Sequence, residues 1–215
     1  MKIVITKKFG EKVLFNRQEF SFEEGKITCL LGESGVGKTT LLRALAGLEK
    51  FEGETDAPKK VAVAFQEPRL LPFASALKNL TFVGVEETQA KEWLSWAEIE
   101  DITRLASTFS GGEKGRVSLV RALAKESELL LLDEPFASVD TARKVRLLAK
   151  LREKLRAEGR TTVFVTHDVD EALFVADKIV LLQEAETTTF VVEERAEYAT
   201  SPLREKIYAK ILKKA

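Results

Sequence analysis

The chain has 215 residues, and its 34 lysines and arginines balance 34 aspartates and glutamates, so the formal net charge is zero. This balance argues against a generally basic surface for nucleic acid or acidic lipid. Hydrophobic residues make up 45% of the sequence, which excludes a largely disordered chain. The length suits one domain, or one domain that carries a smaller subdomain.

The single cysteine and the apolar segments predict the surroundings of the protein. Cys29 has no second cysteine to pair with and lies in an apolar stretch, so we expect a small buried core residue in a reducing, cytoplasmic setting. The first residues hold no segment that is apolar enough for a signal peptide, and no run reaches the roughly 18 apolar residues that span a bilayer. We therefore expect a chain that does not itself cross a membrane.

In chain order, the first half predicts strands within residues 2–31, a helix over about 38–47, a buried strand over 61–65 and helical segments within 74–107. Trp93 and Trp96 lie three residues apart, on one face of the last helical segment. Because this spacing is simply helical, the two tryptophans are expected to be packing anchors rather than a binding site.

The second half alternates helices with short apolar runs. It predicts helices over about 113–125, 141–157 and 170–176, and strands over 129–132, 162–165 and 179–182. Such alternation is typical of a parallel sheet covered on both faces, so the predicted fold class is α/β, with an antiparallel part from the N-terminal strands. An edge strand over 187–193 and a basic helix ending in Lys213-Lys214-Ala215 complete the predicted elements.

The strongest motif is Gly32-Glu33-Ser34-Gly35-Val36-Gly37-Lys38-Thr39, which fits the pattern G-x-x-x-x-G-K-[ST] between a predicted strand and a predicted helix. Its glycines let the backbone turn tightly and present N–H groups to phosphate oxygens, and the helix N-terminus adds partial positive charge. Lys38 is expected to bridge the β- and γ-phosphates, and the Thr39 hydroxyl to bind Mg²⁺. The motif therefore predicts a nucleotide site.

A pair of carboxylates follows the apolar run Leu129–Leu132. Asp133 and Glu134 come at the carboxyl end of this predicted strand, where open α/β sheets collect their ligands. Asp133 is placed to hold Mg²⁺ through its water shell, and Glu134 to accept a proton from the water that attacks the γ-phosphate. The pair predicts hydrolysis of the bound nucleotide.

Three further motifs lie next to predicted strands or helices. Gln66 follows a buried strand, and its amide can bind the metal or orient water. His167 is the one histidine; it follows a strand and precedes a helix, which favours a role in sensing the γ-phosphate over a structural one. Ser110-Gly111-Gly112 opens a helix and offers a second anion site, which one ATP in one chain does not need.

In this order and spacing, the motifs resemble those of the nucleotide-binding subunit of ABC transporters, over roughly residues 3–182. Within that resemblance Gln66 is similar to the Q-loop glutamine, Ser138-Val139-Asp140 to the D-loop, and His167 to the switch histidine. In the family the segment at Ser110-Gly111-Gly112 completes the ATP pocket of the opposite subunit. The resemblance therefore implies two nucleotide-binding chains, head to tail, with two ATP at their interface.

The resemblance also implies the cofactors ATP and Mg²⁺ and a P-loop NTPase core. Residues 1–215 would form one domain, with an N-terminal antiparallel β subdomain and a small helical subdomain inserted over about 74–125. The implied catalytic residues are Glu134, His167, Lys38 and Gln66, and the implied metal ligands are Thr39, Gln66 and Asp133. The implied nucleotide contacts are Phe9, which resembles the aromatic that stacks on adenine, and Gly32, Glu33, Ser34, Gly35, Val36, Gly37, Lys38, Thr39, Thr40, Ser110, Gly111, Gly112 and Asp140.

Two residues depart from the family pattern. Phe109 stands where leucine is usual, and it keeps the apolar bulk. Glu113 stands where glutamine is common, and it adds a negative charge near the incoming phosphate. Because Ser110, Gly111 and Gly112 remain, we expect activity to survive, so the departures bear on its rate.

The segment from Phe65 to Phe73 is similar to that of importer ATPases of the nitrate, sulfonate and taurine type. In the family this region receives a coupling helix of the membrane partner. Its prolines and its apolar residues Leu70, Leu71 and Phe73 are consistent with an exposed docking loop; the alternative is that they pack internally.

The expected protein is therefore the ATPase subunit of an importer of a small solute, peripheral on the cytoplasmic face of the cell membrane. Its expected partners are a second nucleotide-binding subunit, a transmembrane permease and an extracytoplasmic solute-binding protein, with no nucleic acid. The alternative is a soluble ABC ATPase that acts on nucleic acid or ribosomes. Zero net charge and the absence of a coiled-coil insertion speak against it.

Overall fold

The computed structural model describes residues 1–183, 187–191 and 202–212. Val192 and Glu193 of the predicted edge strand, and the predicted basic end at 213–215, lie outside these described residues. The strands are β1 (Lys2–Phe9), β2 (Lys12–Ser21), β3 (Ile27–Leu31), β4 (Glu52–Thr55), β5 (Val61–Ala64), β6 (Leu129–Asp133), β7 (Thr161–Thr166), β8 (Lys178–Leu182) and β9 (Thr187–Val191). The helices are α1 (Lys38–Leu45), α2 (Ala76–Thr81), α3 (Glu87–Trp96), α4 (Gly111–Ala124), α5 (Thr141–Glu158), α6 (Val169–Val175) and α7 (Pro202–Leu212), with a 3₁₀ turn at Ala106–Thr108.

The strands form two sheets, which confirms the predicted α/β class. The larger sheet has the order β5-β6-β7-β3-β8-β9; its first five strands run parallel, and β9 is antiparallel at the edge. The smaller sheet, β2-β1-β4, is antiparallel. Its strand β4 was not predicted, because its four residues are all exposed and carry no apolar alternation.

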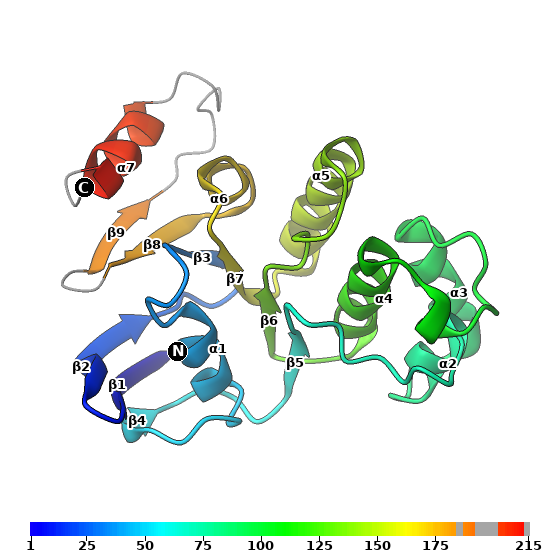
Figure 1. Ribbon diagram of the computed structural model, residues 1–215, viewed down its shortest axis with the longest axis horizontal. Coiled ribbons are helices and arrows are strands. Elements are labelled where there is room, and N and C mark those ends of the chain that lie inside the picture. Colours follow the sequence, from blue (N-terminus) through cyan, green and yellow to red (C-terminus); the bar gives the residue numbers. More distant parts are fainter. Residues whose placement is uncertain (184–186, 192–201, 213–215) are drawn as a thin grey trace.

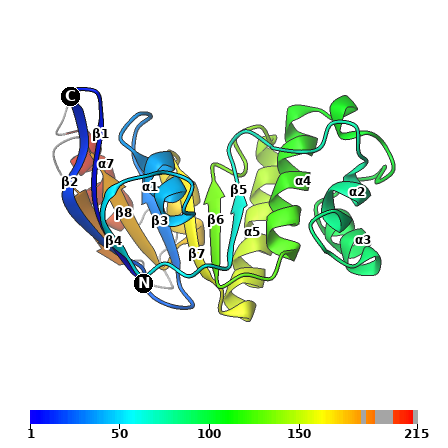
Figure 2. The same cartoon turned by 90° about the horizontal axis from the view of Figure 1, so that it is seen from below.

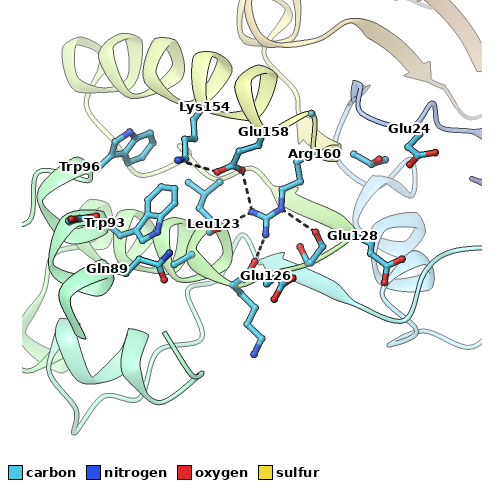
Figure 3. A pocket seen from close by; sticks show the side chains of 16 residues that line it. Glu24, Gln89, Trp93, Trp96, Leu123, Glu126, Glu128, Lys154, Glu158 and Arg160 are labelled. Atoms are coloured by element: carbon cyan, nitrogen blue, oxygen red, sulfur yellow. Dashed lines mark hydrogen bonds and ion pairs between the residues drawn. The ribbon is translucent and has the colours of Figure 1, made fainter. Parts of the chain in front are cut away.

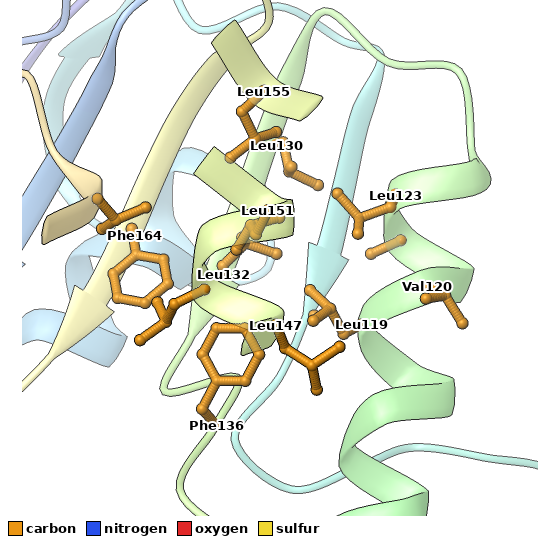
Figure 4. Close-up of a cluster of buried hydrophobic side chains, with 14 of the residues drawn as sticks. Leu119, Val120, Leu123, Leu130, Leu132, Phe136, Leu147, Leu151, Leu155 and Phe164 are labelled. Atoms are coloured by element: carbon orange, nitrogen blue, oxygen red, sulfur yellow. The ribbon is translucent and has the colours of Figure 1, made fainter. Parts of the chain in front are cut away.

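The large sheet is covered on both faces (Figures 1 and 2). On one face, α1 and the small sheet pack over side chains such as Leu131 and Val163. On the other face, α4 packs against β5 and β6, and Figure 4 shows leucines of α4 and α5 in one cluster with the side chains of Leu132 and Phe164. Because β3 and β6 are buried on both faces, they are continuously apolar rather than alternating.

The helices α2, α3 and α4 pack against one another at the end of the molecule that lies farthest from the small sheet (Figure 2). The predicted helical stretch 74–107 is thus two helices and one 3₁₀ turn. Trp93 is buried, and its ring meets that of Trp96 edge-on at 5.7 Å between centroids, consistent with their expected packing role.

The loop before α2 divides the three apolar residues of the expected docking segment. Leu70 packs against the core, whereas the Phe73 side chain is 76% exposed. The buried Asn79 amide accepts a hydrogen bond from the Leu71 N–H at 2.8 Å and donates to the Leu71 carbonyl at 3.2 Å. These bonds hold the loop against α2 and leave Phe73 as its exposed apolar residue.

Among the helices in the described part of the chain, none has both the length and the apolar character that a membrane crossing requires.

Candidate active site

The phosphate-loop motif joins the carboxyl end of β3 to the start of α1. Gly32 has φ 155°, and a Cβ atom there would lie 2.4 Å from the Leu182 carbonyl oxygen of neighbouring β8. Gly37 caps α1 with φ 106° and offers no side chain to the N–H groups of the first helical turn. These groups remain directed at the loop, where the helix dipole favours an anion.

The Lys38 ammonium group is held inside the loop. Lys38 is buried, and its Nζ donates to the carbonyls of Gly32 at 2.6 Å and Glu33 at 2.8 Å. Burial lowers the pKa of Lys38 from its usual value, while the nearby carboxylates of Glu134 and Asp133 act in the opposite direction. The geometry thus places one cation at the centre of the loop.

Asp133 and Thr39 form the donor pair beside this lysine. The Thr39 hydroxyl donates to Asp133 Oδ1 at 3.2 Å, from the start of α1 to the end of β6. Asp133 is buried, and burial raises the pKa of its carboxyl group above the usual value, although the Thr39 hydrogen bond and the charge of Lys38 act in the opposite direction. A buried carboxylate beside a hydroxyl is a donor set that fits Mg²⁺.

No cage of three or more acidic, histidine or cysteine ligands occurs within the described residues.

Glu134 has an unusual backbone at the end of β6. Its φ is 45°, a left-handed conformation that is rare for a residue with a side chain, and its N–H donates to the Val165 carbonyl at 3.0 Å. Strained residues of this kind gather at functional sites. The Glu134 carboxylate lies between two polar side chains, with Oε1 3.1 Å from His167 Nδ1 and Oε2 accepting from Gln66 Nε2 at 3.4 Å.

A cavity of about 330 Å³ brings half of the predicted site residues together. Its lining residues are Phe9, Lys12, Leu14, Ser34, Gly35, Gly37, Lys38, Thr39, Thr40, Gln66 and Glu134. A neighbouring cavity of about 290 Å³ is lined by the remaining loop residues Gly32, Glu33 and Val36, with Ser34 and His167. Ser34 lines both cavities.

The sequence did not single out two residues that line the larger of these cavities, Lys12 and Leu14. Lys12 pairs with Phe9 across the β1–β2 hairpin, around the turn that Gly10 makes with φ 59°. The Phe9 ring is 52% exposed and therefore available for stacking. A sequence signal for Lys12 did exist: a two-residue turn at Gly10-Glu11 places the residues on either side of it, Phe9 and Lys12, next to each other.

Ser110, Gly111, Gly112 and Asp140 do not line the cavity. They lie at the exposed N-termini of α4 and α5, which are packed against each other: a Cβ atom on Gly112 would lie 2.7 Å from the Ser138 carbonyl oxygen. The residues of the predicted second anion site thus lie at a separate place on the surface of the chain.

The two departures from the family pattern have local partners. Phe109 is buried, with the Arg104 guanidinium 4.4 Å from the centre of its ring. Glu113 accepts from the Ser110 N–H at 2.9 Å in a capping box and pairs with Arg104. The carboxylate of Glu113 therefore caps α4 and has the positive charge of Arg104 beside it.

A larger cavity of about 710 Å³ lies between α3, the end of α4 and the end of α5 (Figure 3). Its basic residue Arg160 donates to the backbone carbonyls of Leu123 at 2.8 Å and Ser127 at 3.5 Å. Its acidic residues outnumber its basic ones: Glu24, Glu92, Glu126, Glu128 and Glu158 against Lys125, Lys154 and Arg160. This lining is unsuited to a nucleotide phosphate, so the candidate active site is the cavity at the phosphate loop.

A glycine loop between a parallel strand and a helix, with a lysine at its centre and two carboxylates at the end of a nearby strand, defines a nucleoside triphosphatase of the P-loop class. Comparisons with known proteins refine this class. The family described as "ABC transporter" matches residues 15–137, more than half of the chain.

Two import proteins are similar over most of the sequence. "Aliphatic sulfonates import ATP-binding protein SsuB 2" of Rhodococcus jostii is 41% identical over 194 residues, which cover 86% of this chain and 78% of the relative. "Aliphatic sulfonates import ATP-binding protein SsuB 1" of Pseudomonas syringae pv. tomato is 40% identical, covering 84% of this chain and 68% of the relative.

Solved structures share the fold. The ATP-binding cassette MJ0796, solved as a dimer in a post-hydrolysis state bound to ADP and Pi, superposes with a TM-score of 0.81 at 27% identity and covers 91% of this chain and 100% of its own. A second dimeric structure of MJ0796, described as a bacterial ABC transporter cassette, gives a TM-score of 0.80 at 25% identity. The chain belongs to the ATP-binding family of ABC transporters, and the resemblance seen in its motifs is confirmed.

Proposed function

We propose that this chain is the ATP-hydrolysing subunit of an importer of a small solute and that it drives a separate membrane permease. The observation that carries the proposal is the meeting of Lys38, Thr39, Asp133, Glu134 and His167 at one edge of the large sheet. Because β3, β6 and β7 are parallel neighbours, their carboxyl ends deliver these side chains to one place.

The residues present fit ATP with Mg²⁺. The N–H groups of the loop, the first turn of α1 and Lys38 would hold the phosphates, and Phe9 would stack on the base. Thr39 and Asp133 would hold Mg²⁺, with Gln66 nearby to bind it or to orient water. When bound, Mg²⁺ neutralises charge that develops on the β- and γ-phosphate oxygens.

Glu134 would act as the general base. Its carboxylate accepts a proton from the attacking water, and His167 holds Oε1 of that carboxylate from the end of the neighbouring strand. The Gln66 amide donates to Oε2 from the end of β5. The left-handed backbone of Glu134 directs its side chain into the space between these two partners.

Each ATP would need a second subunit. Ser110, Gly111, Gly112 and Asp140 lie at exposed helix N-termini outside the cavity that holds Lys38. A head-to-tail pair of chains would bring these residues of one subunit to the phosphate loop of the other, with two ATP between them. The dimeric cassettes that share this fold support this arrangement.

The permease would bind the surface around α2. Phe73 and Phe82 are exposed by 76% and 77%, and both line an apolar hollow of about 340 Å³ together with Leu71. A contiguous apolar surface of this kind suits an amphipathic helix of a partner. We place the subunit on the cytoplasmic face of the membrane, with an extracytoplasmic solute-binding protein as the third component. Aliphatic sulfonates are the first solutes to test, because the similar import proteins are named for them.

In this proposal the chain is one ATPase domain, and residues about 74–125 form its helical subdomain. The packing of α2, α3 and α4 on one another at one end of the molecule supports this division. The subdomain would carry the hollow that faces the permease on one side and Ser110–Gly112, which face the second subunit, on another. It would therefore connect the permease to the second ATPase subunit.

The decisive experiment measures Mg²⁺-dependent ATP hydrolysis by the purified chain and by Glu134→Gln. Removing a general base lowers turnover by about 10²–10⁴, while binding of ATP is retained because Lys38 and the loop are unchanged. Glu158→Gln, far from the phosphate loop, is the matched control and keeps wild-type turnover. Full activity of Glu134→Gln would refute the assignment of the base, and a wild-type chain without ATP hydrolysis would refute the proposed function.

A further inference from the structure

Glu98 combines two unusual properties. It has φ 57°, although it is neither glycine nor asparagine, and its carboxylate is surrounded by three basic side chains of a different helix. It follows the C-terminus of α3, where its N–H donates to the Ser95 carbonyl at 3.0 Å and the next N–H, of Ile99, donates to Leu94 at 3.0 Å. These two backbone hydrogen bonds form a Schellman motif. Glu98 occupies its left-handed position, which favours glycine.

The carboxylate connects α3 to the first half of α5. Its Oε2 accepts from Arg143 Nε at 3.0 Å and from Arg146 at 3.3 Å, and its Oε1 lies 3.7 Å from Lys150 Nζ. The hydrogen bond from Arg146 is the main cause that holds the pKa of Glu98 below its usual value. Partial burial acts in the opposite direction. The group is therefore ionised at neutral pH and attracts all three cations.

Arg143 carries this connection to the residue that begins α5. Its backbone N–H donates to Asp140 Oδ1 at 3.0 Å, and its guanidinium lies 3.5 Å from Asp140 Oδ2. One guanidinium thus contacts the carboxylates of both Glu98 and Asp140. Asp140 ends the segment Ser138-Val139-Asp140, which the proposed function places opposite a second subunit.

The backbone of the same turn is attached to α4. The buried Arg116 donates from Nε to the Ala97 carbonyl at 2.8 Å and from Nη2 to the Glu98 carbonyl at 3.5 Å. Arg116 lies one helical turn after Gly112, which is packed against the Ser138 carbonyl. The turn at Glu98 therefore contacts both helices whose N-termini carry the proposed intersubunit residues.

We propose that Glu98 is a positioning residue for ATP hydrolysis between subunits: its carboxylate fixes Ser138–Asp140 relative to Ser110–Gly112. The proposal rests on the proposed function. A glycine at this position would remove the backbone strain, so a purely structural requirement would favour glycine. The carboxylate present at this position has three basic partners on α5, which a glycine would lack.

The test compares Glu98→Gly and Glu98→Gln with wild type. Glycine relieves the left-handed backbone but deletes the carboxylate, while glutamine keeps the backbone and the shape but removes the charge. We expect Glu98→Gly to lower kcat for ATP at least fivefold, with a KM within twofold of wild type and an unfolding temperature equal to or above it. The kcat of Glu98→Gln should lie between those of wild type and Glu98→Gly. Glu87→Gln, which breaks only an ion pair within α3, is the control and should leave kcat unchanged.

A second measurement separates positioning from stability. In a Glu134→Gln background, adding Glu98→Gly should raise at least fivefold the ATP concentration needed for dimer formation, measured by light scattering. The proposal is overturned if both Glu98 variants keep kcat within twofold of wild type, or if their losses of kcat follow losses of unfolding temperature. A different outcome would refute the proposed function itself: the wild-type chain does not hydrolyse ATP, and the Glu134→Gln variant does not form dimers when ATP is added.

Discussion

Replacing Gly112 by alanine tests whether the N-terminus of α4 must contact the segment before α5. The new Cβ atom would lie 2.7 Å from the Ser138 carbonyl oxygen, whereas ordinary contact begins at 3.4 Å. The backbone of Ser138 or of α4 must therefore move by about 0.7 Å, the difference between these two distances. Overpacking of this kind costs about 1–3 kcal/mol, and the gain in helix propensity, at most about 1 kcal/mol, is smaller in a first turn.

We therefore expect Gly112→Ala to be destabilised by about 1–2 kcal/mol. For a chain of this size that lowers the Tm by about 2–8 °C. The displaced loop should also reduce ATP turnover roughly tenfold, because a misplacement of about 1 Å can cost up to a hundredfold. Thermal unfolding followed by circular dichroism and a steady-state ATPase assay measure the two effects.

Gly115→Ala in the same helix is the matched control. Its Cβ would lie 3.8 Å from the Pro135 carbonyl, an ordinary contact, in the helix interior. It should gain about 0.5–1 kcal/mol of stability and keep wild-type turnover. The reasoning is refuted if Gly112→Ala is as stable as Gly115→Ala and hydrolyses ATP at the wild-type rate.

Three further predictions concern the core, the pH dependence and the permease surface. Leu147→Ala, in the fully buried cluster between α5 and the sheet, should lower the free energy of unfolding in urea by about 2–5 kcal/mol; a loss below about 1 kcal/mol would contradict the packing. Burial raises the pKa of Asp168, but hydrogen bonds from backbone N–H groups of α6 and from Lys144 outweigh it, so the pKa lies below the ordinary 3.8. Ionised Asp168 then stabilises the fold at neutral pH, and this contribution is lost as the pH falls below 3.8, so Asp168→Asn should flatten the acid limb of stability against pH. Phe73→Asp, at an exposed side chain, should leave stability within about 0.5 kcal/mol but abolish stimulation of ATPase activity by the permease; unchanged stimulation would place the permease elsewhere.

The sequence predicted much of the fold because its signals are local. The apolar runs at Leu129–Leu132 and Thr162–Val165 indicate buried parallel strands, whatever surrounds them. The phosphate loop could be predicted in the same way, since its glycines, Lys38 and Thr39 are consecutive in the sequence and act through one strand, one turn and one helix. Parallel strands then imply that residues which follow them meet at one edge, which predicted Glu134 and His167 at the same edge as the phosphate loop; their contact of 3.1 Å came from the structure.

Contacts that depend on register or on distant elements were not predictable. Lys12 lines the nucleotide cavity because the hairpin pairs it with Phe9, and nothing in its own neighbourhood marks it as a site residue. Glu98 is an ordinary acidic residue in the sequence. Its left-handed backbone and its partners Arg143 and Arg146 depend on how α3 packs beside α5, about 45 residues later in the chain.

The sequence by itself thus determined the fold class, the phosphate loop and the residues that follow each strand. Each depends on hydrophobic periodicity or on backbone geometry within a few consecutive residues. The tertiary structure alone decided where the charges act: Glu113 is neutralised by Arg104, Asp133 is buried beside Thr39, and Glu98 joins two helices. The physical reason is that the energy of a charge depends on burial and on neighbours a few ångströms away, and these are set by packing between elements far apart in the chain.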